Sequence, residues 1–138
     1  MSTTSDVLRT IPLFHGMTDQ SIETISHLAV PASFAAGDVL VREGEPGDSF
    51  MVLTAGQATV EKDGQSIRSL AVGDFLGEIS LIDGGPRTAT VTATSPVEAL
   101  TVDRAGFGRL MAEFPVVRLD LVSALTQRLR ERAPTPTD

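Results

Sequence analysis

Residues 75–91 read FLGEISLIDGGPRTATV: a glycine opens a short apolar helix, a Gly-Gly-Pro corner follows, and an arginine leads into a β-prone run. Gly77 allows the backbone to approach a bound group closely. The first N–H groups of the helix predicted after it have no partner inside the helix, and this positive end favours an anion. The corner at 83–86 reverses the chain and can bring Arg87 back over the same point. The sequence therefore predicts a phosphate held from two sides.

The charge of this segment, the cassette (residues 75–91), limits what it can hold. A nucleoside triphosphate usually needs several cations or Mg²⁺, whereas one arginine and one helix start suit a singly charged phosphate diester. Glu78 can accept hydrogen bonds from sugar hydroxyls, as acidic residues do in dinucleotide sites. One phosphate charge, one ribose hydroxyl and one arginine together describe a cyclic nucleotide.

The same residues resemble the cyclic-nucleotide-binding domain family, whose phosphate-binding cassette follows a pattern close to F-G-E-[LI]-[AS]-L, a short turn, and P-R-[TSA]-A-[TS]-V. One departure is Leu76, inserted between the phenylalanine and the glycine. The resemblance implies that Glu78 binds the ribose 2′-hydroxyl and Arg87 the cyclic phosphate, with backbone N–H contacts from Ser80 and Thr88. The implied ligand-binding residues are Gly77, Glu78, Ile79, Ser80, Arg87, Thr88 and Ala89.

A plainer interpretation of the cassette stays open. Glu78 and Arg87 could form a buried ion pair that pins a turn, and Gly-Gly-Pro is ordinary corner chemistry. The joint match over roughly fifteen positions favours the ligand site, because each further position makes a motif more specific.

The rest of the chain predicts a mainly β fold. From about 31 to 103, some eight short β-prone runs alternate with glycine turns, which is typical of an antiparallel jelly roll. Lys62-Asp63-Gly64-Gln65 predicts a hairpin, because Asp-Gly suits a type I′ turn. Helices are expected in pieces over 5–30, capped at Thr18, and again over about 103–132, capped at Asp103. We expect one domain over 1–138, an eight-stranded antiparallel β-roll with N-terminal helices, two C-terminal helices and a polar tail at 133–138.

The last predicted helix begins at Pro115, and most of its apolar residues fall on one face: Val116, Leu119, Val122, Leu125 and Leu129. The resemblance implies that this helix is a lid over the nucleotide base, with Leu125, Arg128 and Leu129 as candidates for the capping side chain. Whether any one of these residues caps a base or packs on the roll or on a second subunit stays open.

Composition narrows the class of protein further. The chain has no cysteine, which excludes disulfides and thiolate chemistry and is compatible with a reducing cytoplasm. A formal net charge of −7 argues against DNA or an anionic membrane as the partner. The N-terminus lacks an apolar core for secretion, and no stretch approaches the roughly 18 apolar residues of a membrane span. The sequence therefore predicts a cytoplasmic protein.

The sequence contains none of the enzyme motifs considered for this chain. There is no nucleophile-elbow motif and no Gly-Lys-Ser/Thr phosphate loop, since Lys62 is the only lysine. His15 and His27, twelve residues apart without a later partner, do not predict a metal site. We expect a protein that is not an enzyme and has no cofactor and no metal.

The resemblance covers about residues 11–132, so we expect neither a DNA-binding module nor another effector domain. It implies a free-standing sensor. An apolar lid of Leu125 and Leu129 would suit adenine, whose hydrogen-bonding demands are lighter than those of guanine, so we expect cyclic AMP to bind first and cyclic GMP second. Such a sensor would signal through its last helix to an unknown protein partner or within a homo-oligomer. The alternative is an adaptor module of the same fold that binds protein partners and no nucleotide.

Overall fold

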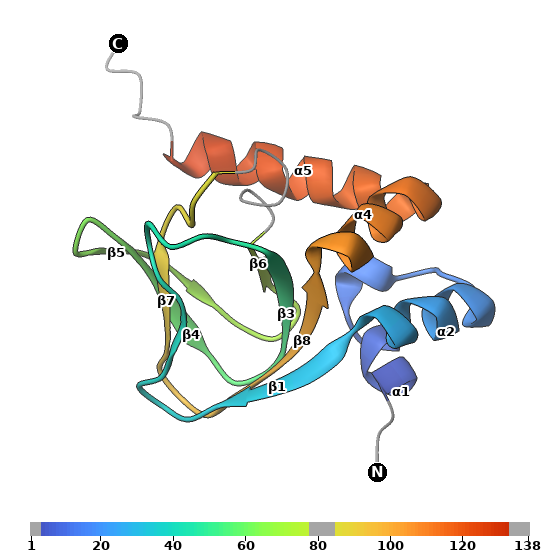
Figure 1. The fold of residues 1–138 in the computed structure, drawn as a ribbon, viewed down its shortest axis with the longest axis horizontal. Helices are drawn as coiled ribbons and strands as arrows, with labels where there is room; N and C mark the ends of the chain where they lie inside the picture. Colours follow the sequence, from blue (N-terminus) through green and yellow to red (C-terminus); the bar gives the residue numbers. More distant parts are fainter. Residues whose placement is uncertain (1–3, 78–84, 133–138) are drawn as a thin grey trace.

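The computed structural model describes residues 4–77 and 85–132, which form two four-stranded antiparallel sheets with helices packed beside them (Figure 1). One sheet has the order β1 (Val30–Phe34), β8 (Val97–Asp103), β3 (Ser49–Ala55) and β6 (Phe75–Leu76). The other has the order β2 (Val39–Val41), β7 (Thr90–Ala93), β4 (Ala58–Lys62) and β5 (Gln65–Leu70). This arrangement confirms the predicted eight-stranded antiparallel β-roll.

Helices flank the roll at both ends of the chain. Before it come α1 (Thr4–Arg9), the 3-10 helix η1 (Pro12–Phe14) and α2 (Asp19–Leu28); after it come α4 (Arg104–Glu113) and α5 (Pro115–Arg132). Both predicted caps are present. The Ser21 N–H donates to Thr18 Oγ1 at 3.1 Å, and the Gly106 N–H donates to Asp103 Oδ1 at 2.8 Å. Each cap satisfies a backbone donor that the first helical turn leaves without a partner.

Strand β3 separates two hydrophobic cores. Its side chains alternate between the two faces of its sheet, as the period of a β-strand requires. Phe50 and Val52 join the core between this sheet and the helices, whereas Met51 and Leu53 join the core between the two sheets. The Phe50 ring lies 5.6 Å from that of Phe75 and 5.3 Å from that of Phe107, measured between centroids. Because β3 is buried on both faces, it is a rigid base for the residues at its ends.

The predicted hairpin joins β4 to β5. Asp63 and Gly64 both have positive φ, 53° and 78°, as a type I′ turn requires, and Lys62 pairs with Gln65 across it. The Asp63 N–H also donates to the Glu43 carboxylate at 3.2 Å, which ties the turn to the loop after β2.

Helix α5 has a different buried face from the one that the sequence suggested. Its core residues are Val117 and Leu121, both at most 1% exposed, and they pack in the core that the helices share with β3. The predicted stripe faces solvent where it is described: Val116, Leu119 and Val122 are 53%, 65% and 54% exposed. The possibility that these three pack on the roll is therefore wrong. The docking of α5 on α4 and η1, and not its apolar periodicity, selects the face that is buried.

Candidate functional site

Arg87 is the one buried charged side chain among the described residues, at 7% exposure. Its guanidinium points at the first residue of β3. Nη1 donates to the Ser49 carbonyl oxygen at 3.0 Å and Nη2 donates to Ser49 Oγ at 3.1 Å. Two hydrogen bonds to one residue fix the plane of the guanidinium, a group suited to bidentate binding of phosphate.

The backbone of Arg87 is held as firmly as its side chain. Its N–H donates to the Glu45 carbonyl at 2.8 Å, and its carbonyl accepts from the Gly44 N–H at 2.9 Å. Pro86 forms an isolated antiparallel bridge with Pro46, and the Glu43 N–H donates to Thr90 Oγ1 at 3.0 Å. The loop between β2 and β3 therefore pairs, through residues 43–46, with the C-terminal part of the cassette at 86–90. Pairing on both sides gives Arg87 one orientation relative to β3.

Gly77, near the start of the cassette, lies close to both Ser49 and Arg87. Its φ is 93°, in the left-handed region, and a Cβ at this position would lie 2.4 Å from the Ser49 carbonyl oxygen and 2.5 Å from Arg87 Nη1. Neither distance is compatible with a side chain, so the closeness of Ser49 and Arg87 itself requires glycine here. The sequence predicted a close approach to a bound group at Gly77, and the structure shows a close approach to two protein groups.

The other predicted site residues divide into two groups. Thr88 is partly buried beside Arg87, whereas Ala89 is 7% exposed and belongs to the core between the sheets. The remaining predicted positions lie outside the described part: Glu78, Ile79 and Ser80, and the side chains of Leu125, Arg128 and Leu129. The structure therefore brings Gly77 and Arg87 into contact and leaves the roles of the others as predictions.

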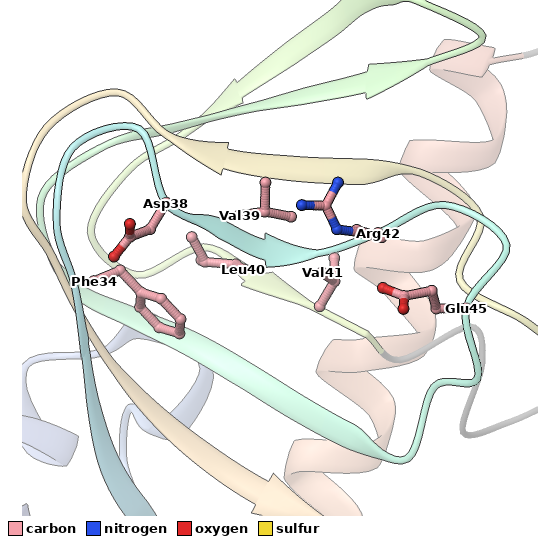
Figure 2. A pocket seen from close by; sticks show the side chains of 7 residues that line it. All are labelled: Phe34, Asp38, Val39, Leu40, Val41, Arg42 and Glu45. Carbon is pink, nitrogen blue, oxygen red and sulfur yellow. The ribbon is translucent and has the colours of Figure 1, made fainter.

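Two surface pockets lie near the loop after β2. The first, about 290 Å³, runs along β2; Figure 2 shows Asp38 and Glu45 toward its two ends, and Arg42 directly follows the strand. An anion there would meet two carboxylates and one guanidinium, so this pocket does not suit a phosphate. The second pocket, about 300 Å³, borders the cassette, and its lining is Gly44, Pro46, Gly47, Asp48, Gly85, Pro86 and Arg104.

The sequence did not predict the residues that hold Arg87. Ser49 is 38 positions away, and Arg104, which donates to the Gly47 carbonyl at 2.9 Å, is 57 positions from its acceptor. A turn before a strand can be predicted from local sequence, but a turn pattern does not say which distant side chain meets it. These contacts depend on the pairing of the strands, which no local pattern determines.

The described residues contain neither a metal-binding cluster nor a helix suited to span a membrane. Among the side chains that the structure describes, there is no group of three or more His, Asp or Glu that could hold a metal ion. His15 is exposed, and Nε2 of His27 lies 3.2 Å from the Glu23 carboxylate on the solvent face of α2. None of the helices described is long and apolar enough to cross a membrane.

The sequence of this chain is similar to those of known proteins. A family model described as cyclic nucleotide-binding domain matches residues 31–114. A cAMP-dependent protein kinase regulatory subunit from Hypocrea atroviridis is 38% identical over 104 residues, which cover 75% of this chain and 22% of that protein. The cGMP-dependent protein kinase egl-4 of Caenorhabditis briggsae is 35% identical over 120 residues, covering 82% of this chain and 16% of that protein.

A solved structure described as "cAMP bound PfPKA-R (141-441)" has the same fold. Its TM-score is 0.82 at 27% identity, over 92% of this chain and 44% of that chain. This chain spans less than a quarter of the length of the two kinase relatives, so the activities of those whole proteins are not carried over with the family. The family model nevertheless matches more than half of the chain, in the segment that forms the roll, the cassette and α4. The chain belongs to the cyclic nucleotide-binding domain family.

Proposed function

We propose that this protein is a sensor that binds cyclic AMP in the cassette and signals through its C-terminal helices. The observation that carries the proposal is the buried Arg87 guanidinium, held in one orientation by Ser49 and by backbone pairing on both sides. A cation fixed before the ligand arrives loses little further conformational entropy on binding. The relatives named above are a cAMP-dependent kinase regulatory subunit and a cGMP-dependent kinase, which supports a cyclic nucleotide as the ligand.

Each residue of the site has a proposed role. Arg87 binds the cyclic phosphate, together with the backbone N–H groups of Ser80 and Thr88. Glu78 accepts a hydrogen bond from the ribose 2′-hydroxyl, and Gly77 brings the start of the cassette against Arg87. Ile79 completes the ligand contacts together with the backbone of Ala89, whose side chain lies in the core between the sheets, and Leu125, Arg128 or Leu129 caps the base. As a sensor, the protein would bind the nucleotide without catalysing a reaction, and binding would need no cofactor or metal.

A ligand titration tests the proposal. In a thermal-shift screen, cyclic AMP at about a hundred times its dissociation constant should add about 2.7 kcal/mol to the free energy of unfolding. Cyclic GMP should give a smaller shift at equal concentration, and 2′-deoxy cyclic AMP should shift less than cyclic AMP because it lacks the hydroxyl assigned to Glu78. An adaptor module of this fold would show no shift with any of the three, and that result would refute the sensor.

The choice of base is predicted to involve Thr88. Thr88 is partly buried and follows the phosphate-binding arginine, and its hydroxyl can accept a hydrogen bond from the 2-amino group of guanine, which adenine lacks. Thr88→Ala should therefore weaken cyclic GMP binding by about two- to tenfold while changing cyclic AMP affinity less. Competition titrations with both ligands measure this, and Thr88→Ser, which keeps the hydroxyl, is the matched control. Equal losses for the two ligands would give the hydroxyl no part in base selection.

The signal is predicted to leave through α5. A ligand can shift this helix only by contacting one of its positions better than another. Hydrogen exchange over residues 116–132 should therefore slow when cyclic AMP binds, and mass spectrometry of peptic fragments measures it. Protection confined to residues 75–91 would mean a static pocket and would contradict signalling through the last helix to a protein partner or a second copy.

A further inference from the structure

One hydrogen bond joins the start of α4 to the loop before β3. Arg104, the first residue of α4, donates from Nη2 to the carbonyl oxygen of Gly47 at 2.9 Å, across 57 residues of chain. Gly47 is buried, so its carbonyl has little access to water. A charged donor on such an oxygen makes one of the stronger classes of hydrogen bond.

This contact lies beside the residue that holds Arg87. Ser49, two positions after Gly47, accepts both hydrogen bonds from the Arg87 guanidinium. Ser49 also pairs with Asp103, the residue immediately before Arg104, in the register of β3 with β8. The path from Arg104 to Arg87 therefore runs through three consecutive residues, 47–49, the last two residues of the loop and the first residue of β3. A displacement of α4 that pulls on Gly47 acts directly on the acceptors of Arg87.

The other end of the path leads to α5. Leu110 of α4 and Val117 and Leu121 of α5 belong to one buried core, and Arg118 Nη1 donates to the Met111 carbonyl at 3.1 Å. The two helices therefore share a packed interface. The 300 Å³ pocket lined by Arg104 and Gly47 lies on this path and also borders the cassette, through Gly85 and Pro86.

The geometry points to Arg104 as a positioning residue that couples the orientation of Arg87 to helix α4. This inference rests on the proposed function, because nucleotide affinity is one of its readouts. Arg104 acts through the Gly47 carbonyl and not on the ligand. A ligand that holds Arg87 stabilises the loop and hence the Arg104 contact, and by linkage the Arg104 contact strengthens ligand binding by the same factor.

The test compares Arg104→Ala with a control arginine on the same helix. Arg109 hydrogen-bonds Glu113 at 2.8 Å within α4, so Arg109→Ala removes an equal charge without touching the loop. Two measurements are made on each folded variant: hydrogen exchange of the loop at 43–50 without nucleotide, and the cyclic AMP dissociation constant by calorimetry. Arg104→Lys, which keeps the charge and one donor, tests for rescue.

We expect Arg104→Ala to speed loop exchange and to weaken cyclic AMP binding by about three- to tenfold, the range for losing one hydrogen bond from a charged donor that is partly exposed. Arg109→Ala should change neither quantity, and Arg104→Lys should restore part of both. A merely structural role for Arg104 would lower the melting temperature and leave the dissociation constant unchanged. If Arg104→Ala does not fold, Arg104→Gln replaces it in the same comparison.

A double-mutant cycle with Ser49→Ala separates this coupling from independent effects. If Arg104 acts through the loop, its loss should matter less once the Ser49 hydroxyl is gone, so the two changes should not add. Additive changes, or loop exchange that Arg104→Ala leaves unaltered, would overturn the coupling while the sensor proposal stands. A wild-type protein that binds no cyclic AMP would overturn both.

Discussion

Arg87→Ala should weaken cyclic AMP binding by at least about thirtyfold. Removing one partner of a buried charge pair typically costs ~2–5 kcal/mol, and each 1.4 kcal/mol is about a factor of ten in the dissociation constant. Arg87 meets the condition for a large effect, because its side chain is only 7% exposed and two hydrogen bonds to Ser49 hold it in place. Isothermal titration calorimetry on the wild-type and variant proteins measures the change.

Two controls make the Arg87 result interpretable. Arg109→Ala removes the same charge from an exposed site on α4 and should leave the affinity unchanged apart from a small long-range term that salt screens. Arg87→Lys keeps the charge but loses the planar fork, so its affinity should lie between those of the wild type and Arg87→Ala. Circular dichroism must show that each variant is folded. Unchanged affinity in a folded Arg87→Ala protein would show that the phosphate site has been assigned to the wrong residue.

Gly77→Ala is expected to have the second largest effect, on stability as well as on binding. The backbone of Gly77 has φ 93°, and an L-residue in a left-handed conformation costs roughly 1–2 kcal/mol. The added Cβ would also lie 2.4 Å from the Ser49 carbonyl oxygen, so the backbone of one segment must move. We expect a loss of at least ~2 kcal/mol in the free energy of unfolding, the size typical of strain at a special backbone position combined with overpacking.

The same clash should also displace Arg87 and so weaken ligand binding. The Cβ would lie 2.5 Å from Arg87 Nη1, and the Ser49 oxygen that it displaces is the acceptor of that nitrogen. We therefore expect cyclic AMP affinity to fall by about tenfold or more, the equivalent of one hydrogen bond from a charged group.

Gly16→Ala is the matched control for the glycine prediction. Gly16 also has a positive φ, 80°, but a Cβ there would meet nothing within 4 Å. This variant should show the conformational cost alone and bind cyclic AMP as the wild type does. Denaturant unfolding and calorimetry on the three proteins separate the two contributions. If Gly77→Ala were no worse than Gly16→Ala in both measurements, the contact of Gly77 with Ser49 and Arg87 would have no energetic importance.

Local patterns in the sequence were sufficient for the elements of the fold. The short β-prone runs separated by turns, the Asp63-Gly64 turn and the helix caps at Thr18 and Asp103 each depend on residues within a few positions of one another, and all are present. The sequence also predicted Arg87 as the phosphate-binding residue from the cassette alone, and this role stays a prediction to be tested by Arg87→Ala.

The tertiary structure alone decided which distant residues meet. Ser49 faces Arg87, and Arg104 reaches Gly47, because β3 pairs with β8 and the loop before β3 pairs with the C-terminal part of the cassette. The burial of Val117 and Leu121 in place of Val116 and Leu119 was likewise determined by the docking of α5, since both pairs have helical spacing and similar hydrophobicity. A sequence pattern reports which residues share a face, whereas the surface available to cover that face depends on the whole fold.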